Sequence, residues 1–121
     1  MASQKILIVD DSSADLINLK TVVSKTDLMV ISATSGTEAI AKAKAEKPDL
    51  IFMDIVMEEM DGYSACREIQ NDPETSNIPI IFVSSKNQKV DQIWAKKQGG
   101  KGLISKPYTE DQILSQIKVY C

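Results

Sequence analysis

The feature that most constrains the fold is a regular alternation of short apolar runs with segments of helical periodicity. The apolar runs span residues 5–10, 28–33, 49–54, 78–84 and 101–105. The helical segments span residues 13–25, 36–46, 63–70, 87–98 and 109–119. Strands that alternate with helices of this length are typical of a parallel sheet with helices on both faces. The nearly continuous apolar character of the runs favours strands that are buried on both sides. The sequence therefore predicts a doubly wound α/β fold.

The alternation continues along the whole chain without interruption. No linker or low-complexity tract separates one βα unit from the next, and 121 residues is an ordinary size for one domain. We therefore expect a single domain over residues 1–121.

Charge and composition exclude several classes of function. The net charge of −3 leaves no basic excess, which argues against nucleic acid as the main partner. No apolar run approaches the roughly 18–20 residues of a membrane span. The N-terminal residues MASQK lack the apolar core of a signal peptide, so the expected location is the cytoplasm. The chain has no histidine, which excludes histidine-based metal sites and Ser-His-Asp triads.

Polar side chains follow four of the five predicted strands. Asp10 ends the first run and Asp11 follows it, Asp54 ends the third, Ser84 ends the fourth and Lys106 follows the fifth. In an open parallel sheet, ligands bind outside the carboxyl ends of the strands. If the first and third strands are neighbours, the three acids converge, and clustered carboxylates need a compensating cation. Ligands that are all oxygen favour a hard cation such as Mg²⁺.

These motifs together resemble bacterial response-regulator receiver domains of the stand-alone, CheY-like kind. The resemblance covers essentially the whole chain and lies in VDDS, in the MDIVM…MDG block at 53–62, in Ser84-Ser85 and in Lys106-Pro107. It implies a flavodoxin-like, five-stranded parallel sheet in the order 2-1-3-4-5. The segment 90–107, VDQIWAKKQGGKGLISKP, is similar to receivers of pilus-motility chemosensory systems.

The resemblance also implies a role for each acidic residue. Asp54 would be the phosphoacceptor and a ligand of Mg²⁺. Asp11 would bind the ion directly, Asp10 would hold it through water, and the backbone carbonyl of Val56 would be a further ligand. Lys106 would pair with Asp54 and then with the phosphoryl group.

The remaining implied roles concern the switch that follows phosphorylation. Ser84 would donate a hydrogen bond to a phosphoryl oxygen, and Pro107 would follow a cis peptide bond. Leu103 stands where the family usually has a switching Tyr or Phe. Glu58 stands where proline is common. We expect these two departures to affect the switch and the loop after Asp54, respectively.

The function that the resemblance implies is a phosphorylation-controlled interaction module rather than an enzyme. It would accept a phosphoryl group from a histidine kinase or phosphotransfer domain. It would then control a downstream target through the face made by residues 87–98, 101–105 and 109–119, in chemotaxis or pilus-dependent motility. Trp94, the only tryptophan, is spaced with Val90 and Ile93 in a way that favours partial packing against the core over a contact with a partner.

Three other interpretations stay open at this point. A flavodoxin-like FMN electron carrier could share the fold, although residues 10–13, DDSS, place carboxylates where the FMN phosphate would bind. An aspartyl-phosphate hydrolase usually has two acids that flank one residue, a spacing absent from DDSS. A phosphorylation-independent interaction module would not require Asp54, Asp11 and Lys106 together.

Overall fold

Five strands and five helices alternate along the chain, as the apolar pattern predicts. The computed structural model describes residues 4–86 and 88–121, so residue 87, the first of the expected fourth helix, lies outside the described residues. The elements are β1 (Lys5–Val9), α1 (Ser13–Val23), β2 (Met29–Ala33), α2 (Gly36–Glu46), β3 (Leu50–Met53), α3 (Gly62–Asn71), β4 (Ile80–Ser84), α4 (Lys89–Lys97), β5 (Gly102–Ser105) and α5 (Glu110–Tyr120).

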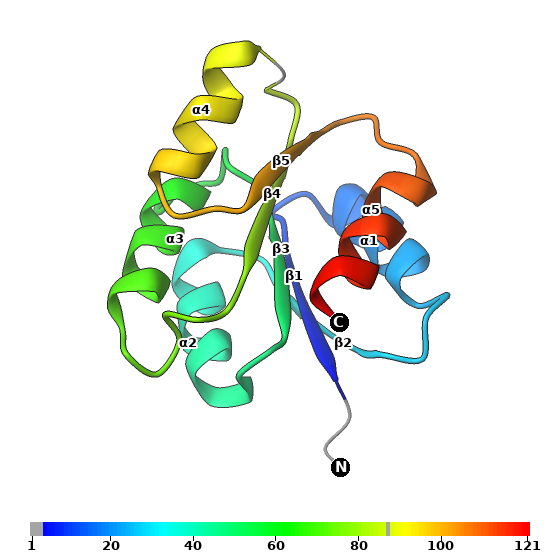
Figure 1. The fold of residues 1–121 in the computed structure, drawn as a ribbon, viewed down its shortest axis with the longest axis horizontal. Coiled ribbons are helices and arrows are strands. Elements are labelled where there is room, and N and C mark those ends of the chain that lie inside the picture. Colours follow the sequence, from blue (N-terminus) through cyan, green and yellow to red (C-terminus); the bar gives the residue numbers. More distant parts are fainter. Residues whose placement is uncertain (1–3, 87) are drawn as a thin grey trace.

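The strands form one parallel sheet in the order β2-β1-β3-β4-β5. Helices α1 and α5 cover one face of this sheet, and α2, α3 and α4 cover the other (Figure 1). The order 2-1-3-4-5 and the doubly wound α/β architecture are therefore confirmed. Strands β1 and β3 are direct neighbours, so the residues that follow them meet at the same edge.

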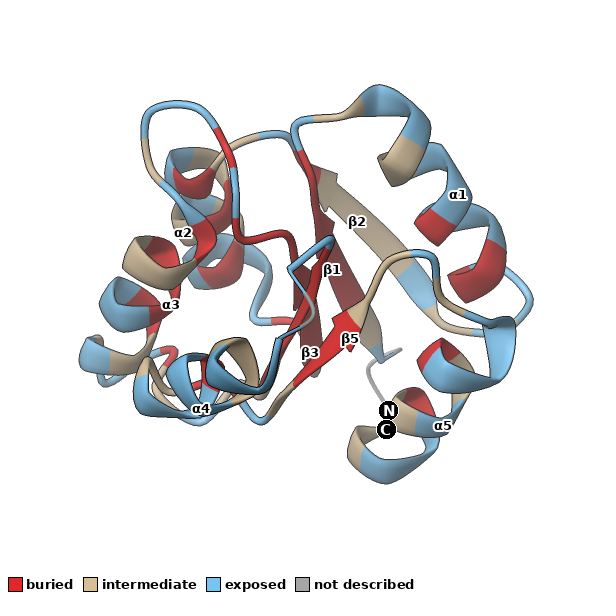
Figure 2. Ribbon diagram, turned by 90° about the horizontal axis from the view of Figure 1, so that it is seen from above, coloured by how far each residue is buried: buried red, intermediate tan, exposed pale blue. Residues whose placement is uncertain are grey.

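The core consists of two apolar layers separated by the sheet. Because successive side chains of a strand point to opposite faces, Ile6 and Ile8 pack toward α1 and α5, whereas Leu7 and Val9 pack toward α2, α3 and α4. Figure 2 shows the buried residues concentrated in the inner strands and on the inward sides of the helices.

Strand β2 departs from the expectation that all five strands are buried on both sides. It lies at one edge of the sheet, and within it Ala33 alone is fully buried. Met29, at its start, is 49% exposed. An edge strand has a neighbour on one side only, so an apolar run in the sequence does not by itself guarantee full burial.

The start of α3 is packed directly onto the backbone that follows β3. The amide of Gly62 donates a hydrogen bond to the carbonyl of Ile55 at 2.7 Å. A Cβ atom at residue 62 would lie 2.0 Å from the backbone carbonyl oxygen of Asp54. This approach is far closer than two nonbonded atoms allow, so only glycine fits at this helix start.

Among the described residues, no helix has the length and the apolar character needed to cross a membrane.

Candidate functional site

Four strands deliver polar side chains to one edge of the sheet. Asp10 follows β1, Asp54 follows β3, Ser84 ends β4 and Lys106 follows β5. Hydrogen bonds between strands continue to this edge. The amide of Asp54 donates to the carbonyl of Val9 at 2.9 Å, and the amide of Lys106 donates to the carbonyl of Ser84 at 2.8 Å. The rigid sheet therefore fixes the backbone from which these side chains project.

Three carboxylates form a compact cluster at this edge. Asp10, Asp11 and Asp54 each offer one oxygen, and these oxygens all lie within 4.8 Å of one another. Asp10 and Asp54 are buried, whereas Asp11 is exposed. Backbone amides orient them: Asp10 accepts from Ser12 at 2.9 Å, and Asp54 accepts from Ile55 at 2.9 Å. The donor set consists of carboxylate oxygens, which fits a hard divalent cation.

Lys106 provides the positive charge nearest to the cluster. Its Nζ atom lies 2.8 Å from Oδ2 of Asp10, 2.9 Å from Oδ2 of Asp15 and 3.8 Å from Oδ1 of Asp54. The expected pair with Asp54 is present, but it is the longest of the three contacts. Asp15 was not identified from the sequence. Its one signal is its position in the first turn of α1, four residues after Asp11.

Burial and neighbouring charges change the pKa of the buried Asp54 and of the partly buried Lys106. Removal from water, followed by the negative charge of Asp10, raises the pKa of Asp54 to about 6, against the lowering effect of Lys106. Burial alone would lower the pKa of Lys106, but its hydrogen bonds to Asp10 and Asp15 raise this pKa above its ordinary value. Lys106 therefore stays positively charged. Its charge only partly offsets the cost of ionising the buried Asp54.

The other residues of the expected site lie around this cluster. Ser84 is fully buried, and its hydroxyl oxygen accepts a hydrogen bond from the amide of Lys86 at 3.4 Å. Leu103 is 9% exposed and packs in the core layer beneath α4. The peptide bond between Lys106 and Pro107 is cis, the isomer that the family resemblance implies.

The loop between β3 and α3 carries the two other residues singled out in the sequence. Val56 has an exposed side chain, and Glu58 is also exposed. The amide of Glu58 donates a hydrogen bond to Oδ2 of Asp11 at 3.2 Å. The next residue, Glu59, has φ of 66°, in the left-handed region. The loop that follows Asp54 is thus tied by its backbone to the exposed acid of the cluster.

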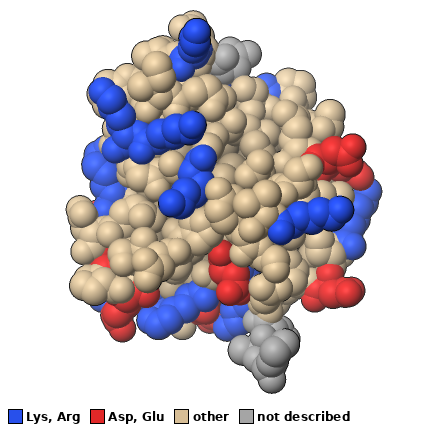
Figure 3. Space-filling model, in the orientation of Figure 1, with Lys and Arg blue, Asp and Glu red and all other residues tan. Residues whose placement is uncertain are grey.

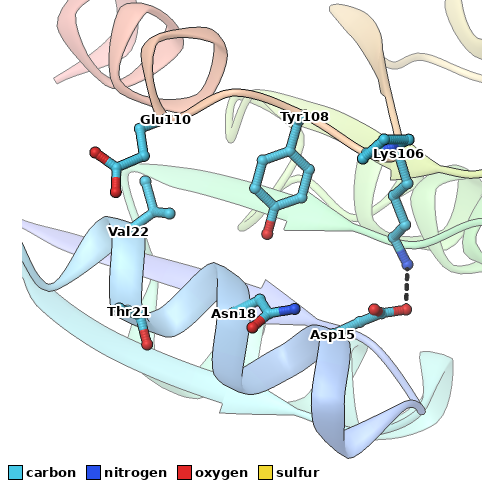
Figure 4. Close-up of a pocket in the computed structure, with 8 residues that line it drawn as sticks. Asp15, Asn18, Thr21, Val22, Lys106, Tyr108 and Glu110 are labelled. Atoms are coloured by element: carbon cyan, nitrogen blue, oxygen red, sulfur yellow. Dashed lines mark hydrogen bonds and ion pairs between the residues drawn. The ribbon is translucent and has the colours of Figure 1, made fainter.

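A hollow of about 550 Å³ adjoins the site on its α1 side. Figure 4 shows Asp15 and Asn18 of α1 on one wall, with Lys106 and Tyr108 opposite. The contact between Lys106 and Asp15 closes one end of this hollow.

A second hollow of about 440 Å³ lies between α3 and α4, and Trp94 lines it together with Tyr63, Arg67 and Val90. Trp94 is 49% exposed, so its packing against the rest of the protein is partial. Within α4, Ala95 alone is buried. Ala95 is the side chain of this helix that is buried against the core, and Ile93 and Trp94 beside it remain about half exposed.

The comparison with known protein families identifies the family to which this chain belongs. The model of the response regulator receiver domain matches residues 6–118. This chain belongs to the response regulator receiver domain family. Receivers act as response regulators in two-component signal transduction, which makes an FMN electron carrier the less favoured alternative.

Individual relatives agree with this assignment. The receiver is 41% identical over 113 residues to protein PilH of Pseudomonas aeruginosa, with 93% of each chain covered. It is 32% identical to protein PilG of the same organism, over 96% of this chain and 86% of the relative. The structure of the chemotaxis protein CheY4 of Vibrio cholerae has a TM-score of 0.91, is 24% identical, and covers 99% of this chain and all of its own. At that identity, CheY4 supports the fold.

Membership of the family implies two kinds of partner. A receiver takes its phosphoryl group from a histidine kinase or a phosphotransfer domain, and it passes information to a downstream target. The family acts in general as a phosphoacceptor and is associated with Mg²⁺, in keeping with the three-carboxylate cluster.

Proposed function

We propose that Asp54 is the phosphoacceptor of this receiver. The observation that carries the proposal is the convergence of three carboxylates and one ammonium group at the carboxyl edge of the sheet. Asp54 is the acid that follows the middle strand, β3, and it is flanked by the acids that follow β1 and by Lys106. It therefore has both the metal ligands and the cation that phosphoryl transfer requires.

The same proposal assigns Mg²⁺ to this cluster. Asp11 and Asp54 would bind the ion directly, Asp10 would hold it through water, and the backbone carbonyl of Val56 would be a further ligand. Mg²⁺ takes few carboxylates and keeps several waters, which suits two buried acids next to one exposed acid. When bound, the ion supplies positive charge to the phosphoryl oxygens.

The chain's own residues then perform the transfer. A carboxylate oxygen of Asp54 forms a bond to phosphorus, while the bond from phosphorus to the donor's histidine nitrogen breaks and that nitrogen leaves with the electron pair. Lys106 neutralises the oxygens on which charge accumulates, and the hydroxyl of Ser84 donates a hydrogen bond to one of them. The receiver is no enzyme with a separate substrate: it assists its own phosphorylation and dephosphorylation.

We further propose that the output surface is the face of α4, β5 and α5. Helix α4 carries Lys96 and Lys97 in its last turn, and Ile93 and Trp94 are about half exposed. Figure 3 shows basic side chains gathered over the part of the surface where α4 lies. Exposed apolar side chains surrounded by lysines favour a target whose docking segment is acidic.

The wider setting is also a proposal. The likeness to PilH and PilG supports a role in chemotaxis or pilus-dependent motility. The family match to residues 6–118 supports a single domain over residues 1–121. We place its action in the cytoplasm, where kinases obtain phosphoryl groups from ATP.

Intact-mass measurement with acetyl phosphate and Mg²⁺ tests the acceptor. The wild-type receiver should gain the mass of one phosphoryl group, and Asp54→Asn should gain none. Ser85→Ala is the control, because it changes a neighbouring side chain and should leave the gain intact. A gain that persists in Asp54→Asn would move the acceptor, with Ser84 and Ser85 the first candidates. No gain in the wild-type chain would favour the phosphorylation-independent module.

A further inference from the structure

Asp15 belongs to no part of the site described by the family resemblance, yet it holds one of the two closest contacts of Lys106. The Nζ atom of Lys106 lies 2.9 Å from Oδ2 of Asp15 and 2.8 Å from Oδ2 of Asp10. Asp15 lies in the first turn of α1, whereas Asp10 directly follows β1. The ammonium group is thus shared between the acidic cluster and a helix outside it.

The position of Asp15 is fixed by the way α1 begins. Ser12 is the N-cap, and its hydroxyl oxygen accepts a hydrogen bond from the amide of Asp15 at 3.3 Å. This capping bond holds the first turn in place, so the carboxylate of Asp15 faces Lys106 across one end of the hollow (Figure 4).

The geometry places the three acids in competition for one cation. The Nζ atom of Lys106 is 3.8 Å from Oδ1 of Asp54, farther than from Asp10 or Asp15. Of the three acids, the proposed acceptor therefore has the weakest attraction to this positive charge. The side chain of Lys106 is 18% exposed, against 42% for Asp15, which makes the pair with Asp15 a partly buried one. Charge pairs of this kind are screened less by water and salt than fully exposed pairs.

We propose that Asp15 is a positioning residue that holds Lys106 toward α1 until the receiver is phosphorylated. This inference rests on the proposed function, in which Lys106 must contact the phosphoryl group on Asp54. The Nζ atom now lies 3.8 Å from Asp54 and 2.9 Å from Asp15, so a close contact with phosphoryl oxygens on Asp54 requires it to move toward Asp54 and away from Asp15. The pair with Asp15 therefore stabilises the unphosphorylated state and slows entry into the phosphorylated one.

Loss of the Asp15 carboxylate should change the rate of phosphorylation and leave the rate of hydrolysis unchanged. Before transfer, Lys106 has to leave Asp15, so loss of the Asp15 carboxylate should accelerate phosphorylation. After transfer, Lys106 already contacts the phosphoryl group, so the rate of hydrolysis should not change. We expect phosphorylation to be about three- to fivefold faster in Asp15→Asn, the factor that a partly exposed ion pair supports.

Three variants separate the carboxylate of Asp15 from a general change of charge. Asp15→Asn removes the charge and keeps the shape, and Asp15→Glu keeps the charge. Asp111→Asn is the matched control, because Asp111 is an exposed acid in the first turn of the other helix on this face, α5. Phosphorylation by acetyl phosphate with Mg²⁺, followed by intact mass, should be faster in Asp15→Asn, while Asp15→Glu and Asp111→Asn behave as the wild-type chain.

A double variant distinguishes positioning from a structural role of Asp15 in α1. If Asp15 acts through Lys106, Asp15→Asn should have no further effect in a chain that already carries Lys106→Gln. An acceleration that persists in that background would overturn the proposal, as would equal rates for Asp15→Asn and the wild-type chain, or a parallel change in hydrolysis.

The wild-type chain gives an independent check. In a structure of its beryllofluoride complex, Nζ of Lys106 should contact the phosphoryl mimic and should have left Asp15. A contact with Asp15 that remains near 2.9 Å would overturn the proposal. Failure of the wild-type chain to accept any phosphoryl group would instead overturn the proposed function, and this inference with it.

Discussion

Lys106 lies closer to Asp10 than to Asp54: its Nζ atom is 2.8 Å from the first carboxylate and 3.8 Å from the second. The buried carboxylate of Asp54 therefore receives only part of the charge of this lysine. Burial and the negative charge of Asp10 raise the pKa of Asp54 to about 6. Without a metal ion, ionised Asp54 is a source of instability in the folded receiver.

The first prediction concerns this instability. Asp54→Asn should raise the free energy of unfolding at pH 7.5, in EDTA, by up to about 3 kcal/mol. The pKa of Asp54 is higher in the folded chain than its ordinary value of 3.8, so the folded state binds the proton more tightly. The contribution of Asp54 to the stability of the wild-type receiver should thus fall as the pH rises from about 4 to 6, and the advantage of Asp54→Asn should vanish near pH 4.

Urea denaturation at several pH values measures this difference. Asp111→Asn is the control, since it removes an exposed acid and should leave the pH profile of the wild-type chain unchanged. Profiles of Asp54→Asn and the wild-type receiver that run parallel from pH 4 to 8 would contradict the prediction.

The second prediction concerns Mg²⁺. The ion should raise the melting temperature of the wild-type receiver in a concentration-dependent way, because it binds the folded state and not the unfolded chain. Asp11→Ala should lose this increase and lose phosphorylation with it. Its stability in EDTA should fall only slightly, since Asp11 is exposed and the hydrogen bond that it accepts from the amide of Glu58 lies at the surface.

Thermal unfolding with and without Mg²⁺ tests this separation. Glu68→Gln removes another exposed acid, on α3, and should keep the full response to Mg²⁺. Normal phosphorylation of Asp11→Ala in excess chelator would show that the metal assignment is wrong.

The third prediction concerns the switch. In the family, an aromatic residue at position 103 moves inward as Ser84 turns to the phosphoryl group. Leu103 is already buried, with 9% of its surface exposed, so it has little room to move inward. Its backbone carbonyl accepts a hydrogen bond from the side-chain amide of Gln92 at 3.1 Å. We therefore expect the change to be concentrated in the loop after Ser84 and at the start of α4, with little movement at Leu103.

Amide exchange and NMR shifts, with and without beryllofluoride, measure where the change occurs. Changes around Leu103 as large as those just after Ser84 would mean that leucine replaces the ring adequately.

The fourth prediction concerns the end of α2. Lys47 is the C-cap and has φ of 46° and ψ of 63°, the left-handed conformation that glycine adopts without strain. Lys47→Gly should therefore raise the free energy of unfolding by about 1 kcal/mol. Lys44→Gly, inside the same helix, should lower it by about the same amount. Urea denaturation compares the two, and a destabilised Lys47→Gly chain would contradict the prediction.

Most of the fold follows from periodicity, and most of the site follows from the ends of strands. Apolar runs and helical spacing place every element within one to two residues of its observed bounds, because both patterns reflect burial in a layered core. Asp10, Asp54 and Lys106 were identified because parallel strands bring their carboxyl ends to one edge.

The parts that could not be predicted depend on how elements are oriented. Asp15 meets Lys106 only because α1 leaves β1 in a particular direction, which no local pattern encodes. The exposure of Trp94 depends on which side of α4 faces the sheet, and Ala95 rather than Trp94 lies on that side. The partial burial of β2 depends on its place at the edge, which the apolar run does not reveal.

The close approach of α3 to Asp54 has a consequence for the direction in which a signal can travel. Because residue 62 has no room for even a methyl group beside the carbonyl of Asp54, α3 cannot slide inward when charge is added at this residue. The start of this helix therefore has little room to move toward the proposed acceptor. If Asp54 is phosphorylated as proposed, we expect the displacement on the other side, in the loops that follow β4 and β5.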